Sequence, residues 1–68
     1  METVMLAKDG GSGEDGCPSV YLQDGALVVQ GPAADLGTLQ HVLDGEVAAR
    51  ISVDVVRDAL AAYDARRP

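Results

Sequence analysis

The single cysteine and the single histidine of this 68-residue sequence are the first candidates for nucleophilic or transition-metal chemistry. Cys17 follows Glu14 and Asp15, and neighbouring carboxylates disfavour the thiolate that nucleophilic or redox chemistry needs. One cysteine and His41 are too few for a zinc site. We therefore expect no metal or cofactor, with Cys17 a structural thiol and His41 solvated or at an interface. A redox switch through an intermolecular Cys17 disulfide is the alternative.

Hydroxyl and carboxylate groups offer no stronger case for catalysis. Ser19 and Ser52 lack the glycine-flanked turn of a nucleophile elbow, and Ser52 precedes an apolar repeat as a helix N-cap does. Asp54 and Asp58 would share one face of a helix, but Arg57 between them favours a solvated surface over acid/base machinery. The sequence therefore predicts that the protein is not an enzyme.

A β-hairpin is the clearest structural element, and it occupies the stretch from Gly16 to Gly31. Two runs rich in β-forming residues, Ser19–Leu22 and Ala26–Gln30, flank a turn at Gln23–Gly25. An Asp-Gly pair between two such runs is typical of a tight hairpin turn. Alternation predicts one apolar face on each strand, which suits a sheet with one packed side.

Two further elements are expected after the hairpin. Pro32 is well placed to open a helix, and Leu36, Leu39 and Leu43 follow at helical spacing, which predicts a short helix over Ala33–Leu43. Apolar and polar residues then alternate from Glu46 to Ile51. This alternation favours a short third strand.

The last segment predicts the strongest helix, over Val53–Ala65. Val53, Val56, Leu60 and Tyr63 recur at helical spacing and would form its apolar face. Asp54 in the first turn and the arginines at the end match the helix dipole. The expected fold class is α+β, built from a β-hairpin, a short helix, a third strand and a C-terminal amphipathic helix.

The first 15 residues differ in composition from the rest of the chain. They are glycine-rich and acidic, a composition that buries too little surface to offset the entropy of ordering. We expect residues 1–15 to be a flexible arm and residues 16–68 to be a single small domain. The short apolar run Val4–Leu6 would then be part of a frayed terminus, with a docking peptide or an extra strand as alternatives.

Composition and charge limit the kinds of partner that the protein can bind. A net charge of −6 argues against direct binding to nucleic acid or to anionic membranes, and favours a basic protein instead. No apolar run approaches the roughly 20 residues of a membrane span, so a cytoplasmic location is expected. A domain this small buries only roughly 60% of its unfolded surface, which makes self-association or a bound partner plausible.

The order of these motifs resembles a known family. Gly16-Cys17, a hairpin turning at Asp24-Gly25, and Arg50-Ile51-Ser52 before an alanine-rich helix are similar to the small acidic actinobacterial proteins typified by BldB. The resemblance spans about Gly16 to Tyr63. The chain departs from the group in lacking aromatic residues near its start and in its closing helix. It also carries extra sequence over residues 33–43.

The resemblance implies a regulatory role in development or secondary metabolism. Such proteins accompany helix-turn-helix transcription regulators and tend to self-associate. We therefore expect a homodimeric, non-enzymatic interaction module for a basic helix-turn-helix regulator, with a structural or scaffold subunit as the alternative. The residues expected to contact the partner are the apolar ones of the hairpin and of the closing helix: Val20, Leu22, Leu27, Val29, Val56, Leu60 and Tyr63.

Overall fold

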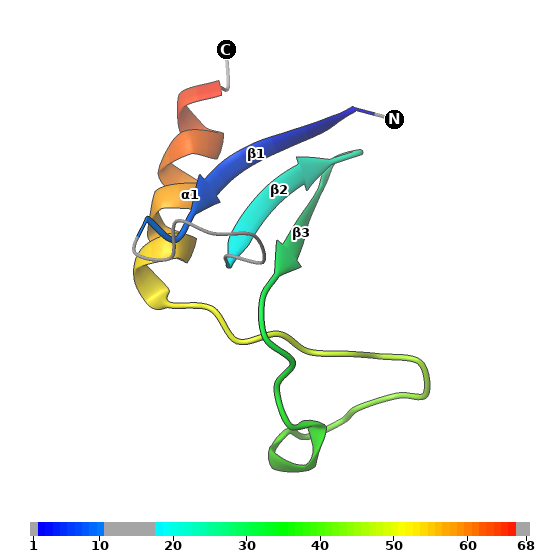
Figure 1. The fold of residues 1–68 in the computed structure, drawn as a ribbon. Coiled ribbons are helices and arrows are strands. Elements are labelled where there is room, and N and C mark those ends of the chain that lie inside the picture. Colours follow the sequence, from blue (N-terminus) through cyan, green and yellow to red (C-terminus); the bar gives the residue numbers. More distant parts are fainter. Residues whose placement is uncertain (1, 11–17, 67–68) are drawn as a thin grey trace.

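A three-stranded antiparallel sheet with one α-helix across one face forms the fold (Figure 1). It is taken from a computed structural model that describes residues 2–10 and 18–66. The strands lie in the order β1-β2-β3, followed by a 3-10 turn and the helix. This arrangement confirms the expected α+β class. The elements are β1 (Thr3–Lys8), β2 (Ser19–Gln23), β3 (Ala26–Gln30), η1 (Leu36–Thr38) and α1 (Val53–Arg66).

The predicted hairpin is confirmed in β2 and β3. Gln23 pairs with Ala26, which leaves only Asp24 and Gly25 in the turn. Their φ angles are 51° and 78°, and two consecutive positive values are what the tight type I′ hairpin turn requires. The register of this pair is regular over all five residues of each strand.

The first residues form a strand, so the expected flexible arm is wrong for residues 3–8. β1 pairs antiparallel with β2, from Thr3 opposite Gln23 to Lys8 opposite Ser19, with an irregularity between Met5 and Ala7. The extra-strand alternative for the short apolar run is therefore correct. Residues 11–15 of the expected arm lie outside the described residues.

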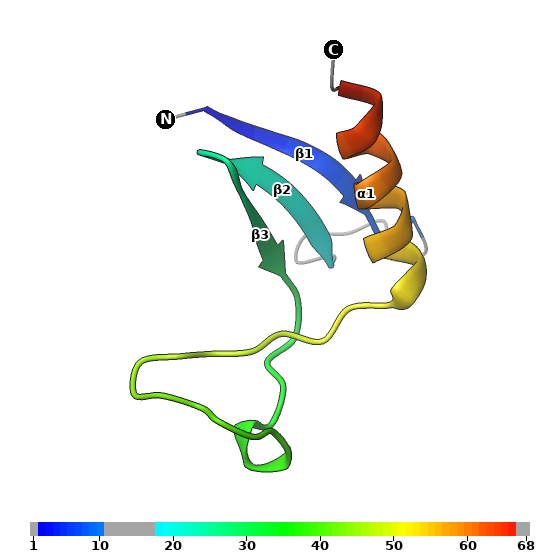
Figure 2. The same ribbon diagram turned by 180° about the vertical axis from the view of Figure 1, so that it is seen from behind.

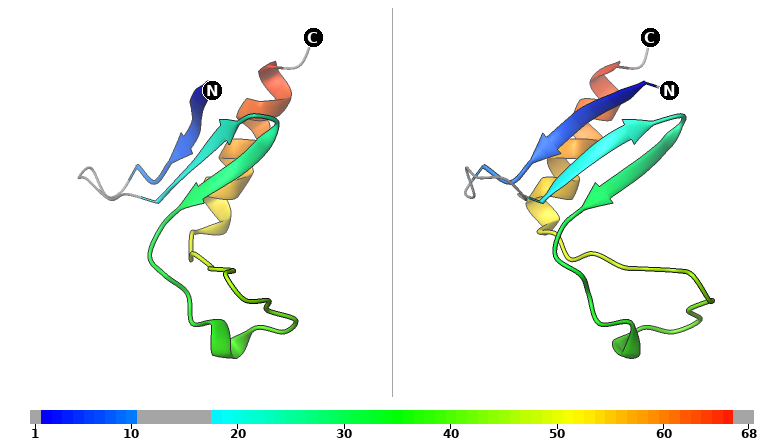
Figure 3. Two further views of the ribbon diagram at one scale, coloured as in Figure 1. Left: turned by 90° about the vertical axis from the view of Figure 1, so that its right-hand side faces the viewer. Right: turned by 45° about the vertical axis from the view of Figure 1, so that its right-hand side comes forward.

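The expected helix over 33–43 and the expected strand over 46–51 are both wrong. Residues 31–51 instead form a long connecting loop that extends beyond the end of the sheet (Figure 3). Only η1 is helical. Asp35 begins it, accepting a hydrogen bond from the Gly37 N–H at 2.8 Å, and Leu39 is already extended. The second segment contributes one isolated bridge, Ala33 with Ala49.

The connecting loop is closed at its base. The Ala34 N–H donates to the Ala48 carbonyl at 2.9 Å, and the Arg50 N–H donates to the Pro32 carbonyl at 2.8 Å. The chain therefore leaves β3 and returns toward α1 through a narrow stem. A loop of this length with so little regular structure is uncommon in a compact domain and is often functional.

Helix α1 matches the predicted closing helix in position but not in its buried face. The Ser52 hydroxyl accepts from the Val55 N–H at 3.2 Å, which confirms the predicted N-cap. Val55 and Ala59 are the buried residues, whereas the expected apolar face is exposed. The small Ala59 side chain lets the helix backbone approach the sheet closely. The exposed residues are Val53, Val56, Leu60 and Tyr63.

The hydrophobic core lies between α1 and the first two strands (Figure 2). Val20, Val55 and Ala59 are each at most 4% exposed, and Leu6, Ala7 and Ile51 pack against them. The helix contacts β1 and β2 but does not reach β3. The third strand therefore has no helix above it.

Candidate functional site

The side chains that could take part in catalysis or metal binding do not lie close to one another. His41 is exposed in the connecting loop, Asp54 and Asp58 are exposed on α1, and Ser19 is buried with its hydroxyl donating to the Tyr21 hydroxyl at 3.2 Å. Cys17 lies outside the described residues. Within residues 2–10 and 18–66, no three His, Cys, Asp or Glu side chains are grouped as metal ligands.

An apolar groove between β3 and α1 is the strongest candidate site. Strand pairing places Val20 directly beside Val29 and Leu22 directly beside Leu27, so all four share the face that α1 covers. Along that face burial falls sharply toward β3, from 2% exposed at Val20 to 43% at Val29. The cause is the position of α1 over β1 and β2 alone.

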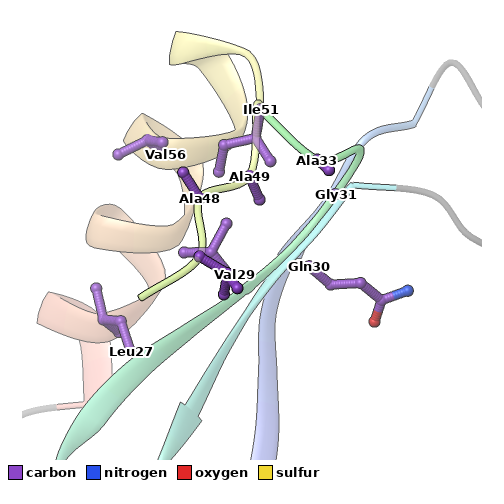
Figure 4. A pocket seen from close by; sticks show the side chains of 10 residues that line it. Leu27, Val29, Gln30, Gly31, Ala33, Ala48, Ala49, Ile51 and Val56 are labelled. Carbon is purple, nitrogen blue, oxygen red and sulfur yellow. The ribbon is translucent and has the colours of Figure 1, made fainter. Parts of the chain in front are cut away.

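The walls of the groove come from three segments of the chain. Figure 4 shows Leu27 and Val29 rising from β3, Val56 facing them from α1, and Ala48, Ala49 and Ile51 of the loop's return segment between them. The Gln30 amide points away from these side chains. The lining is therefore almost entirely aliphatic and small, which suits another apolar surface better than a polar metabolite. The full lining is Leu27, Val29, Gln30, Gly31, Ala33, Val47, Ala48, Ala49, Ile51 and Val56.

Six of the seven predicted interface residues remain candidates. Leu27, Val29 and Val56 line the groove, and Leu60 and Tyr63 continue along the exposed side of α1 beyond it. Leu22 is half-buried. Val20 is wrong as an interface residue, because its side chain is 2% exposed and belongs to the core of the chain itself.

The connecting loop holds an apolar surface that sequence reasoning missed. Leu39, Val42, Leu43 and Val47 are 39–91% exposed. Helical spacing predicted a packed helix face for Leu39, Val42 and Leu43, and alternation placed Val47 in a strand, but all four are exposed. The sequence feature that argued against a helix in this segment was Gly37, because glycine weakens a helix by roughly 1 kcal/mol relative to alanine.

The polar groups around the groove are carboxylates more often than bases. The exposed charged residues of α1 are three carboxylates, Asp54, Asp58 and Asp64, and two bases, Arg57 and Arg66, and none of them lines the groove itself. The chain as a whole carries a net charge of −6. Its field attracts a positively charged partner toward whichever apolar surface then makes contact.

Comparisons with known proteins identify no relative of this chain. No family model matches the chain, and no curated protein or solved structure is significantly similar to it. In the described residues, no helix is both long enough and apolar enough to cross a bilayer.

Proposed function

We propose that this chain is a non-enzymatic regulatory module that binds a helix-turn-helix transcription regulator and acts as a homodimer. The observation that carries the proposal is the uncovered apolar groove between β3 and α1. Leu27, Val29 and Val56 are 38–45% exposed there, whereas the buried hydrophobic residues in the described part of the chain are only Val20, Val55 and Ala59. Apolar surface gathered on one side of a small protein is typical of an interaction site.

Charge and resemblance indicate the kind of partner. A net charge of −6 speeds encounter with a basic protein and repels nucleic acid, so contact with the regulator rather than with its DNA is favoured. The resemblance to the BldB group supports a helix-turn-helix regulator as that protein. A cytoplasmic location follows from such a partner.

A pull-down against candidate regulators from the native host tests the proposal. We expect wild-type chain to retain a helix-turn-helix regulator and Val56→Asp to lose it, because Val56 is a 38% exposed apolar residue that lines the groove from α1. Met5→Asp is the matched control, since Met5 is 51% exposed on β1, on the opposite face of the sheet. Salt should weaken retention, because screening removes the attraction of the basic partner.

Two results would contradict the proposal. One is recovery of no transcription regulator by the wild-type chain. The other is equal loss of the regulator in Val56→Asp and Met5→Asp, which would show that the groove has no special role in binding.

A further inference from the structure

The two edge strands of the sheet differ in how they are protected. β1 has an irregular register between Met5 and Ala7 and ends with Lys8, and both features discourage pairing with another strand. β3 pairs regularly with β2, carries no charge from Ala26 to Gln30, and all five of its residues are exposed. A regular, uncharged and exposed edge is a template for a further strand.

The backbone of β3 is ready to accept such a strand. Paired residues of an antiparallel ladder alternate between hydrogen-bonded and non-hydrogen-bonded positions. When the pair Gln23 and Ala26 that closes the turn is hydrogen-bonded, Leu27 and Val29 direct their N–H and C=O groups to the outer edge. No other described element lies along that edge, because the sheet order ends at β3.

The exposed area of the chain is large enough for an interface with a second copy. The chain exposes 5259 Å², whereas a folded monomer of its mass exposes about 4,000 Å². The excess of about 1,200 Å² exceeds the roughly 800 Å² that each partner contributes to a standard interface. A two-fold contact between identical chains uses the same patch on both, so one uncovered β3 edge on each chain supplies both sides of it.

We propose that β3 pairs antiparallel with β3 of a second copy, about a two-fold axis that passes beside Val28. In this register Leu27 lies opposite Val29 of the second copy, and Val28 lies opposite its own counterpart. All five residues of β3 are paired, and the outward groups of Leu27 and Val29 are satisfied on both chains. No charged residue occurs between Asp24 and Asp35, so two acidic chains meet without opposing carboxylates along the strand.

The dimer completes the groove. A two-fold axis perpendicular to the sheet places both α1 helices on the same face of a continuous six-stranded sheet. Leu27 and Val29 of both copies then form the floor of one apolar trough, walled by Val56 on each side. The use of this trough for a regulator rests on the function proposed above, whereas the strand pairing stands without it.

Molar mass in solution is the first test. We expect wild-type chain at about 100 µM to run in light-scattering chromatography as a dimer, twice its 7.0 kDa. Val28→Lys should raise the dimer dissociation constant at least tenfold, because it sets like charges face to face. Met5→Lys is the matched control: Met5 and Val28 both pair with Tyr21 and share one sheet face, with 51% and 41% exposure.

A cross-link tests the register. Non-hydrogen-bonded antiparallel pairs hold their Cα atoms about 4.5 Å apart, within the range for a disulfide. In a Cys17→Ser background, Val28→Cys should form an interchain disulfide, with oxidised glutathione taking up the two electrons. Met5→Cys in the same background should not form one above background.

Several outcomes would overturn the pairing. They are a wild-type monomer at about 100 µM, equal dimerisation of folded Val28→Lys, or no preference for the Val28→Cys cross-link. Circular dichroism of each variant confirms that it is folded. Capture of the regulator by a wild-type monomer would overturn the pairing and the homodimer but not the binding of the regulator, and a wild-type dimer that captures no regulator would overturn only that binding.

Discussion

Gly31 lies against the backbone of Arg50, so closely that a β-carbon on Gly31 would stand 2.7 Å from the Arg50 carbonyl oxygen and 2.9 Å from the Ile51 Cγ2. These contacts join the end of β3 to the segment that leads into α1. They lie beside the two hydrogen bonds that close the connecting loop. Glycine is required here by space, since its φ lies outside the left-handed region.

Gly31→Ala should therefore destabilise the fold by about 1–3 kcal/mol, the usual cost of overpacking against atoms that cannot move freely. Urea unfolding followed by circular dichroism measures the change. Gly10→Ala is the control, because nothing lies within 4 Å of a β-carbon there and its φ is ordinary. Equal effects of the two substitutions would contradict the close contact at Gly31.

Val55→Ala should cost about 2 kcal/mol, from the lost burial of its methyl groups and the space left behind. Leu60→Ala, which removes more atoms, should cost less than about 1 kcal/mol because Leu60 is 47% exposed and Val55 is 4% exposed. Thermal and urea unfolding of both variants measure the order. The reverse order would mean that α1 buries its larger apolar stripe.

Gly25→Ala should destabilise the hairpin by about 1–2 kcal/mol, since an alanine at a φ of 78° bears the cost of left-handed backbone. Asp24→Asn should be nearly neutral, because asparagine accepts the 51° φ of that position as readily as aspartate does. Unfolding curves of the pair give the comparison. A neutral Gly25→Ala would be inconsistent with the two-residue turn.

Removal of residues 1–8 should abolish cooperative unfolding, because it deletes β1 and strips α1 of most of its packing surface. On heating, the far-ultraviolet circular dichroism signal of the truncated chain should change gradually, without a cooperative transition. An unchanged melting temperature would contradict the pairing of β1 with β2.

Ser52→Ala should lower stability by about 1 kcal/mol, through loss of the hydrogen bond from the Val55 N–H to the hydroxyl. Ser52→Asp should restore most of this loss, because aspartate caps a helix equally well. A loss that aspartate does not restore would point to packing of the serine instead of capping.

Local signals predicted the hairpin and the closing helix well. The Asp24-Gly25 turn and the Ser52 cap each depend on a few neighbouring residues, so the sequence carries them directly. The site was predicted less well. Leu27, Val29 and Val56 are exposed and stay predicted interface residues, whereas Val20 is buried in the core, because strand alternation does not reveal which strands the helix covers.

Three features of the fold could not be predicted from the sequence, because they depend on contacts between distant segments. β1 pairs across a glycine-rich segment, so its partner is not visible from composition. The spacing of Leu36, Leu39 and Leu43 fits a helix, but an isolated helix of that length is marginal without packing, and Asp35 instead bonds locally to Gly37. On α1 the larger side chains suggested the core face, whereas close approach to the sheet selects Val55 and Ala59.

The packing of α1 against β1 also sets the order of folding. Residues 3–8 meet residues 53–66, so the core closes only by joining segments that are far apart in the chain. Such long-range closure slows folding and prolongs exposure of apolar strands. During synthesis on the ribosome, β1 and β2 emerge before the helix that shields them, and their uncovered apolar face in that interval is open to capture by a chaperone or by a neighbouring nascent chain.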